Sequence, residues 1–530
     1  MLRLEDVWNF IFYLFLGLIP LLVFAYFYLT STFDHWKKKG VDHIKPSFPF
    51  GNLGDVMMGR KSLTDLTIEQ YTQFEGKPYF GIFNFTTPVL VLKDPSIVER
   101  VLMTDFAHFC DRGEDNLAPE NDPFNYYIGN LSGDTWRQLR HKINGAFSNS
   151  KLKRMTELIS FCANFMLEHI AGQVAKKESI YLDCLGYGFS HRVIAKCAFG
   201  IECDEYGVKE FIVHVKKIFL KMKVVHMIIL SHIYTPRLIK FLYMIPPVDK
   251  VVQYFKTISL ETIRVRQGVQ VKRNDFLQVL LDLREEEIKE NRNDAVENTT
   301  TVSSYRKSST GKGTLEKKCL FTENMIMSQM FMFMSLGMET TAVAVTFIFL
   351  DLATNAEVQA KVQEEIDSVV DRYGELSYEA TQQLNYLDLV IQESLRLHPG
   401  FPYLHRVCVS PYRVPGSELT LEKGTTILIP SCAIHLDPGN YHEPQVFNPE
   451  RFLDNNYKPS PTYLPFGVGP RMCIAVKLVI LELKLAVAKV MQRYSVKLKS
   501  ETPLPPKYAP TFMPKLLQGL WAEFTERPHS

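Results

Sequence analysis

One cysteine stands where a glycine-rich turn becomes an apolar helix, in the segment PFGVGPRMCIAVKL, residues 465–478. Gly467 and Gly469 permit a tight loop ahead of Cys473, because they lack the side chain that disfavours positive φ. Backbone N–H groups of this loop, and of a helix expected to start near Cys473, would point at the sulfur and favour the thiolate. A thiolate held in this way suits either nucleophilic catalysis or metal ligation.

The two chemistries open to Cys473 make different demands. A nucleophile needs a histidine base nearby, and the segment supplies none. Ligation by a single thiolate is rarer, but haem iron uses it. The chain has nine cysteines and no C-x-x-C pair, which excludes the common structural zinc patterns and offers no disulfide framework.

The residues around Cys473 resemble the haem-binding signature of the cytochromes P-450. Phe466, Gly469, Arg471 and Cys473 have the spacing of that signature, while Ala475 replaces its usual glycine. We expect the extra methyl group to be tolerated through a slight shift of the helix. The resemblance implies haem b with Cys473 as the axial iron ligand and Phe466 shielding the sulfur from water.

Further motifs match the family in order and spacing over about residues 40–525. The resemblance implies that Glu393 and Arg396, in an E-x-x-R helix, form a buried charged triad with Arg451 of the segment FNPERF. This triad would hold the loop that carries the cysteine. Because a partly broken triad would leave a buried charge uncompensated, we expect all three side chains to be bound together.

A long helix is expected at about 321–354, and it carries LGMETT at 336–341, where the family has its oxygen-binding groove. The resemblance implies that Glu339 and Thr340 are the catalytic pair. A hydroxyl beside a carboxylate can hold a water and transfer the two protons that dioxygen activation consumes. Leu336 stands where many relatives have a small residue, so it would narrow the pocket.

Several side chains match positions that bind the haem propionates in the family. They are Arg471, Arg140, Trp136, Arg406 and Arg112. Charge-assisted N–H···O bonds would hold the carboxylates. A lone arginine is ordinarily a solvated surface charge, so this prediction requires that the fold bring the five together.

The resemblance implies a haem-thiolate monooxygenase that inserts one atom of O2 into a lipophilic small molecule, such as a steroid, a fatty acid or a xenobiotic. NADPH would supply electrons through the membrane-bound NADPH–cytochrome P-450 reductase, with cytochrome b5 as a further partner. The Glu339–Thr340 pair favours this activity, because rearranging a peroxide needs no delivered protons. An isomerase resembling thromboxane synthase and a non-catalytic haem or sterol carrier stay open as alternatives.

Three segments also suggest a subfamily. Residues 339–367, 384–399 and 484–499 resemble the animal microsomal group that holds the family-3 drug-oxidising enzymes and thromboxane synthase. The family's fold is a mainly α, triangular helical body around haem, with a minor β region. The periodicity of the chain agrees with a mainly helical body. It predicts a hairpin at 78–93, helices at about 94–285, 321–354, 356–371, 377–397 and 473–494, and short strands at 401–434.

The N-terminal end carries an uncharged apolar run at 8–29, about the length that spans a bilayer as a helix. Lysines at 37–39 follow it and two acidic residues precede it, so the positive-inside rule places the body in the cytosol. A cleaved signal peptide is disfavoured by the length of the run. We therefore expect residues 1–34 to form a single-pass anchor in the endoplasmic reticulum membrane, with the span at about 8–30.

The rest of the chain divides by composition. We expect a basic, proline-containing hinge at 35–55, a catalytic domain at 56–525 and a polar, flexible linker within it at 290–318. The apolar, lysine-containing stretch at 205–250 is either a buried helix pair or a surface that enters the membrane. Sixty basic and 58 acidic side chains nearly balance, which gives no basic field for nucleic acid.

Overall fold

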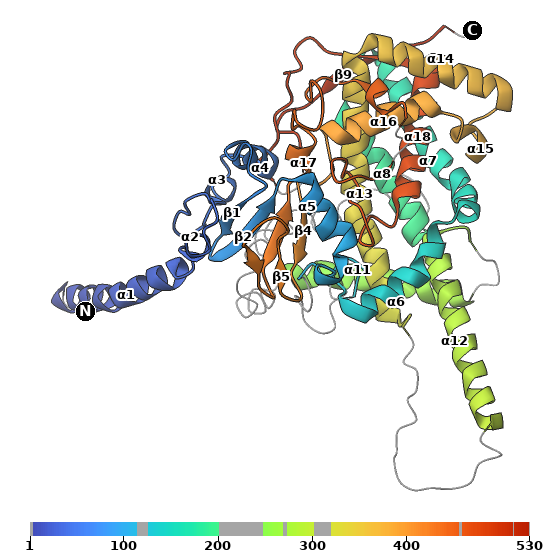
Figure 1. Cartoon of the computed structure of the whole chain (residues 1–530). Coiled ribbons are helices and arrows are strands. Elements are labelled where there is room, and N and C mark those ends of the chain that lie inside the picture. The colour runs from blue at the N-terminus through green and yellow to red at the C-terminus, as the bar shows by residue number, and fades with distance from the viewer. Residues whose placement is uncertain are drawn as a thin grey trace.

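The computed structural model describes residues 4–113, 126–200, 247–268, 273–301, 320–454, 458–511 and 514–528. Within these ranges the chain is mainly helical, with three small sheets. A β-rich part lies on the side of the molecule toward the N-terminal helix, and a larger helical part lies beyond it (Figure 1). Most of the apolar stretch predicted at 205–250 lies outside the described residues.

The helices occupy much of the chain. The N-terminal ones are α1 (Leu4–Thr30), α2 (His35–Lys38), α3 (Gly54–Met57), α4 (Leu63–Thr72) and α5 (Pro95–Glu99), continued by a π-helical turn at Arg100–Thr104. The central ones are α6 (Gly133–Asn144), α7 (Asn149–Lys176), α8 (Leu182–Phe199), α11 (Pro247–Gly268), α12 (Phe276–Thr301) and α13 (Glu323–Thr354). The C-terminal ones are α14 (Ala356–Tyr373), α15 (Tyr378–Thr381), α16 (Asn385–Leu397), α17 (Ser431–Ile434) and α18 (Val476–Arg493).

The predicted hairpin is confirmed as β1 (Tyr79–Asn84) and β2 (Thr87–Leu92), which pair antiparallel. They belong to a four-stranded sheet of order β1-β2-β7-β4, in which β7 (Thr426–Ile429) runs parallel to β2 and β4 (Leu404–Val407) completes the edge. Two smaller sheets have the order β3-β9-β8 and β5-β6. Their strands are β3 (Ile180–Tyr181), β8 (Tyr494–Leu498), β9 (Trp521–Glu526), β5 (Tyr412–Arg413) and β6 (Thr420–Leu421).

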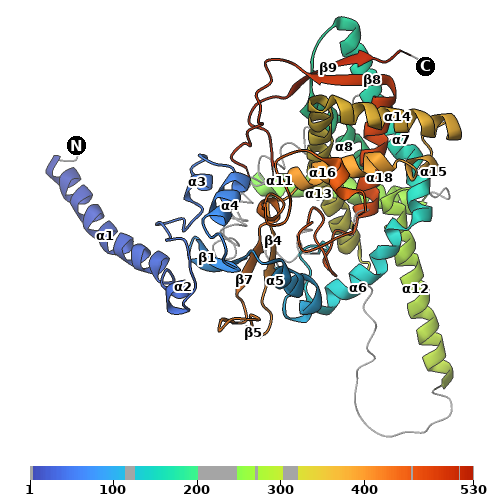
Figure 2. The same cartoon turned by 45° about the horizontal axis from the view of Figure 1, so that its top comes forward.

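Helix α13 runs through the helical part, with α8 and α18 beside it (Figures 1 and 2). It begins at a side-chain cap, since the hydroxyl of Thr322 accepts from the N–H of Met325 at 3.2 Å. By length and composition α13 could cross a membrane, but 78% of its apolar window is buried inside the protein. A helix that is apolar on all sides is expected at the centre of a large core, which is where α13 lies.

Helix α1 projects away from the body in both views (Figures 1 and 2). Its described apolar side chains are exposed, including Phe24 at 71%. The chain just after α1 is fixed to the sheet, because Trp36 is fully buried and its indole N–H donates to the Ile82 carbonyl at 3.0 Å. A Cβ on Gly81 would lie 2.4 Å from the Trp36 ring, so the glycine makes room for this contact.

Two predicted element boundaries were wrong. Helix α12 continues to Thr301, so part of the segment predicted as a flexible linker at 290–318 is helical, and residues 302–319 lie outside the described ranges. Residues 290–301 (ENRNDAVENTTT) are polar almost throughout, and a helix that is polar on all sides can extend into solvent. The single helix predicted at 377–397 is two helices, α15 and α16.

Candidate active site

The loop that carries Cys473 is held by its own backbone. The N–H of Cys473 donates to the carbonyl of Phe466 at 2.9 Å, and Gly467 and Gly469 have φ of 69° and 74°. A Cβ on Gly469 would lie 2.0 Å from the carbonyl oxygen of Leu102, so only glycine fits there. The tight turn predicted from the two glycines is therefore confirmed.

The helix after this loop begins later than expected. Helix α18 starts at Val476, so Cys473 lies ahead of its first turn. Burial raises the pKa of Cys473, while the N–H of Ala475 and the guanidinium groups of Arg140 and Arg112 oppose the shift. A backbone donor does favour the thiolate, as expected, but desolvation outweighs it in the protein without a bound metal. A metal cation at the sulfur would supply the charge that deprotonates it.

Arginine side chains converge near Cys473 from different segments. Arg406 of β4 is 2% exposed, and its Nε has no hydrogen-bond partner among the described residues. Burial and the like charges of Arg112 and Arg471 lower the pKa of Arg406 well below its usual value. Burial and Arg112 also lower the pKa of Arg140. Arg406 and Arg471 are buried and Arg112 and Arg140 are half-buried, and like charges removed from water in this way call for an anion between them.

The guanidinium group of Arg471 also contacts Trp136 and two backbone carbonyl groups. Its guanidinium lies 3.9 Å from the centre of the buried Trp136 ring. It donates to the carbonyl of Cys110 at 2.8 Å and to that of Leu131 at 2.7 Å. These bonds hold the cysteine loop against the segments on either side of residues 114–125. Contact of Arg471 and Trp136 with a propionate stays a prediction.

The described residues fit the haem that the sequence implies. They include no cluster of three or more His, Cys, Asp or Glu side chains that could hold a bare metal ion. They do include a single thiol close to the guanidinium groups of Arg140 and Arg112. A group with one metal and two carboxylates matches both features, since the metal takes the thiolate and the carboxylates satisfy the arginines. Among the described side chains, the Nε of Arg406 is the atom that most directly requires such an anion.

The predicted charged triad is present and buried. Arg396 donates to the two carboxylate oxygens of Glu393 at 2.7 and 2.8 Å, and neither residue is exposed. Arg451 donates to Glu393 at 3.0 Å. The second arm of Arg396 donates to the carbonyls of His435 and Pro444, both at 2.7 Å. The triad therefore joins α16 to the irregular segment that leads to Cys473.

A histidine that sequence reasoning missed connects this triad to the cysteine loop. Burial lowers the pKa of His435 to about 3, so its ring is neutral near pH 7. Nδ1 lies 2.9 Å from the carbonyl of Arg396, and Nε2 accepts from the N–H of Leu464 at 2.7 Å. The protonated nitrogen must therefore be Nδ1. No motif spacing marks His435, and only its two contacts reveal its role.

Three consecutive polar residues of α13 contact three different neighbours. Glu339 accepts from the hydroxyl of Tyr187 in α8 at 2.5 Å. Thr340 donates to the carbonyl of Leu336 at 2.7 Å, within its own helix. Thr341 donates to the carboxyl group of Glu482 in α18 at 3.2 Å.

The catalytic pair expected from the sequence is thus adjacent but not directly bonded. The described residues include no hydrogen bond between Glu339 and Thr340, so a proton passing between them needs a bridging water. Burial raises the pKa of Glu339, while the Tyr187 hydrogen bond and the charge of Lys515 oppose the shift. Tyr187 was not predicted, because nothing in the spacing of α8 pairs it with α13.

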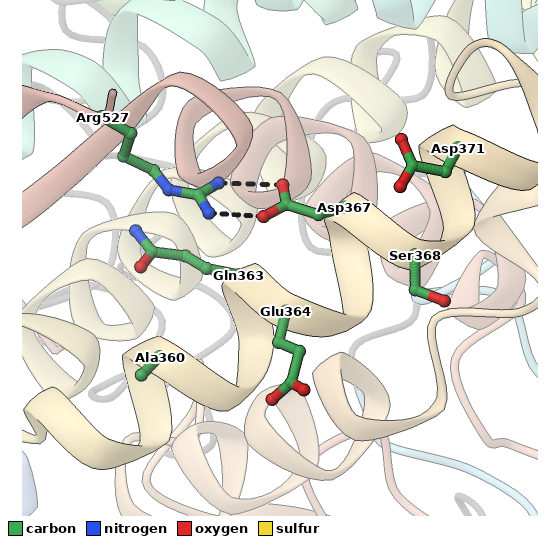
Figure 3. A pocket seen from close by; sticks show the side chains of 7 residues that line it. All are labelled: Ala360, Gln363, Glu364, Asp367, Ser368, Asp371 and Arg527. Carbon is green, nitrogen blue, oxygen red and sulfur yellow. Dashed lines mark hydrogen bonds and ion pairs between the residues drawn. The ribbon is translucent and has the colours of Figure 1, made fainter. Parts of the chain in front are cut away.

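A separate groove lies on the surface of α14 (Figure 3). Its lining residues are Ala360, Gln363, Glu364, Asp367, Ser368, Asp371 and Arg527. The acidic Asp367 is already bound by Arg527 at 3.0 and 2.5 Å. None of the predicted site residues lines this groove, so the candidate active site is the region around Cys473 and α13.

Comparison with known proteins adds independent evidence. The sequence matches the Cytochrome P450 family over residues 45–519. It is 32% identical to cytochrome P450 9e2 of Blattella germanica over 99% of each chain. It is 31% identical to probable cytochrome P450 6d5 of Drosophila melanogaster, over 91% of this chain and 94% of that one. It is also 31% identical to cytochrome P450 6B2 of Helicoverpa armigera, over 91% and 92%.

These relatives are insect enzymes, and the finer resemblance to the family-3 and thromboxane synthase group is not supported. The segments that suggested it, 339–367, 384–399 and 484–499, fall mainly in the helices α13, α14, α16 and α18. These helices contribute to the core, where packing constrains the residues whatever the substrate. Taken together, the thiol, the buried arginines, the charged triad and the match over most of the chain show that the protein belongs to the cytochrome P450 family and is a P450 monooxygenase.

Proposed function

We propose that this enzyme oxidises lipophilic small molecules, of the steroid, fatty-acid or xenobiotic class, with electrons from NADPH. NADPH–cytochrome P-450 reductase delivers them, and cytochrome b5 is a second electron donor. The observation that carries the proposal is the thiol of Cys473 near buried, mutually repelling arginines, among them Arg406, whose Nε has no partner in the described part of the chain. The acid and hydroxyl side chains on α13 support an activity that consumes protons.

Each site residue has a proposed role. Cys473 binds the iron, Phe466 covers the sulfur, and the triad with His435 holds the loop that carries them. The propionates are bound by the guanidinium groups of Arg406, Arg140 and Arg112. The loop is held by Arg471 and Trp136, which also contribute to the propionate site. When bound, the haem supplies oxygen binding and its reductive activation. Glu339 and Thr340 hold a water and move protons toward the reacting oxygen.

Helix α1 is proposed to anchor the enzyme in the endoplasmic reticulum membrane, with the catalytic domain on the cytosolic face. The exposed apolar side chains of α1 support this placement, since a bilayer would cover a surface that water solvates poorly. The lysines at 37–39 directly after the helix support a cytosolic body. This position also brings the enzyme to its membrane-bound reductase and to membrane-dissolved substrates.

The first experiment tests the iron ligand. The reduced protein with carbon monoxide is expected to show the difference band of a thiolate-ligated haem, and Cys473→Ala is expected to lose it together with NADPH-dependent oxidation. Cys184→Ala is the matched control, because Cys184 is exposed on α8 and should leave the band unchanged. Activity retained by Cys473→Ala would contradict the assignment.

A second experiment separates the proposed activity from the alternatives. A spectral binding screen against steroids, fatty acids and drug-like compounds selects a ligand, and turnover is then measured with and without NADPH and reductase. A monooxygenase needs both, whereas an isomerase converts a peroxide substrate without them. Product formed from a peroxide in the absence of NADPH would overturn the proposal, and so would ligand binding without any turnover.

A further inference from the structure

The carboxyl group of Glu339 faces α8, and α8 approaches α13 closely at this point. A Cβ on Gly186 would lie 2.3 Å from the carbonyl oxygen of Ala342, so a larger residue there would separate the helices. The hydroxyl of Ser190 donates to the carbonyl of Met338 at 2.6 Å. Between these two contacts, the hydroxyl of Tyr187 donates to Glu339 at 2.5 Å.

Further titratable groups of α8 and of the segment before β9 lie near Tyr187 and Glu339. Asp183 lies one turn before Tyr187 on α8 and is 8% exposed, and it accepts from the hydroxyl of the half-buried Tyr181 at 2.8 Å. The exposed Lys515 acts electrostatically on both Asp183 and Glu339. Asp183 and Lys515 therefore act on Glu339 through their charges, whereas Tyr187 contacts its carboxyl group directly.

The charged and titratable groups that act on Glu339 are consequently known. They are Tyr187 and Asp183 of α8, and Lys515 of the segment before β9. Tyr187 is the one hydrogen-bond donor to the Glu339 carboxyl group among the described residues. His191 contacts the backbone carbonyl of Tyr187 and so supports the same turn of α8.

We propose that Tyr187 is a positioning residue that orients the Glu339 carboxyl group and controls its proton affinity. The proposal rests on the proposed monooxygenase function, in which Glu339 passes protons toward Thr340. A donor to the ionised carboxylate favours that form, so Glu339 releases a proton more readily with Tyr187 than without it.

The first test needs no turnover. Unfolding of wild type, Tyr187→Phe and Glu339→Gln is followed between pH 5 and pH 9 in detergent micelles, together with the double variant. A carboxyl group with a raised pKa binds extra protons in the folded state, so stability falls as pH rises through the window of its titration. Loss of Tyr187 raises the proton affinity of Glu339, so the fall should extend to higher pH. In the Glu339→Gln background, Tyr187→Phe should not alter the pH dependence.

The matched control is Ser190→Ala, which removes another hydrogen bond between α8 and α13 without touching Glu339. A purely structural role of Tyr187 predicts that Tyr187→Phe, like Ser190→Ala, loses stability by an amount that does not change with pH. That result would overturn the proposal. So would a Tyr187→Phe substitution that changes the pH dependence equally in the wild-type and Glu339→Gln backgrounds.

The second test uses the reductase, NADPH and the ligand found by the binding screen. Tyr187→Phe is expected to lower product formed per NADPH by about tenfold, to release the difference as peroxide, and to move the Glu339-dependent limb of the pH profile upward. Ser190→Ala should keep the wild-type pH profile. If wild type turns over and Tyr187→Phe matches it in coupling and pH profile, this inference is wrong and the proposed function stands. If wild type shows neither the thiolate band nor NADPH-driven oxidation, the proposed function itself is wrong.

Discussion

Glu339, Thr340 and Thr341 are neighbours in the chain, yet their side chains contact α8, the helix's own backbone and α18. Successive residues of an α-helix point about 100° apart, so three in a row can face three different elements. The sequence resemblance groups Glu339 and Thr340 as one catalytic unit. The structure shows that each is oriented separately, and that Tyr187 and Glu482 therefore affect this part of α13 as well.

Glu482 should give the protein a distinctive pH dependence. It is 3% exposed, and burial raises its pKa to about 8 from 4.5. The folded state then binds more protons than the unfolded state between these values. The free energy of unfolding should therefore fall by up to about 1.4 kcal/mol per pH unit as pH rises through this window. Glu482→Gln should remove this contribution and make the slope shallower, as measured by denaturant unfolding in detergent micelles.

The slope that Glu482 causes is best measured above pH 6.5. Below pH 6.5 the titration of His435 makes the free energy of unfolding change with pH in the opposite direction. Burial lowers the pKa of His435 from 6.5 to about 3, so its contribution to stability rises with pH within that window. Above pH 6.5 this contribution is constant. An equal slope for wild type and Glu482→Gln between pH 6.5 and pH 8 would show that Glu482 is ionised in the folded state.

Arg406 should destabilise the haem-free protein and slow the loss of haem from the loaded protein. It is a buried cation whose Nε has no partner in the described ranges, and Arg112 and Arg471 repel it. Replacing such a charge with an apolar side chain is often neutral or stabilising by about 1–4 kcal/mol. Arg406→Met should therefore unfold at equal or higher denaturant in the haem-free form, and lose haem faster to an acceptor protein. Arg413→Met is the control, since Arg413 pairs with Glu418 at the surface.

At the scale of elements, the cysteine loop depends on contacts with distant segments. Gly469 approaches Leu102 of the π-helical turn, Arg471 reaches Cys110 and Leu131, and His435 binds the N–H of Leu464. The glycine pattern correctly predicted a tight turn. It could not predict the later start of α18 or the raised pKa of Cys473, because both depend on what surrounds the loop.

Two alanine substitutions separate backbone strain from close packing in this loop. Gly467 and Gly469 both have positive φ, so each change to alanine should cost about 1–2 kcal/mol in backbone strain. Only at Gly469 would the new Cβ overlap a backbone oxygen, that of Leu102, whereas at Gly467 the nearest atom is 3.6 Å away. Gly469→Ala should therefore lose most of the carbon monoxide band, and Gly467→Ala should keep it. Equal losses would show that strain alone decides the outcome.

At the scale of the whole molecule, the protein joins a buried helical core around α13 to an exposed apolar helix, α1. Both helices are apolar enough to suggest a membrane span, and hydropathy does not separate them. Their surroundings do, since α13 is covered by α8 and α18 while α1 projects from the body (Figures 1 and 2). The connection through Trp36 ties α1 to the sheet.

Two truncations test this arrangement. Removal of residues 1–30 should move the enzyme from the membrane to the soluble fraction while keeping the carbon monoxide band, because Trp36 stays in place. Removal of residues 1–40 also takes away Trp36, whose loss from a buried site costs about 3–5 kcal/mol. The shorter protein should therefore unfold at lower temperature, as measured by circular dichroism. Equal thermal stability of the two truncated forms would contradict a structural role for Trp36.

The periodicity of the chain was sufficient to predict the hairpin and most helix positions, and the family resemblance of its short motifs predicted the charged triad and supplies the proposed iron ligand. These features depend on local periodicity and on short motifs, which one sequence displays directly. The tertiary structure decided the rest: the convergence of arginines from β4 and α6, the bond from Tyr187 to Glu339, and the link through His435. Proton affinities and side-chain directions depend on every neighbour that removes water from a group, and those neighbours come from segments far apart in the chain.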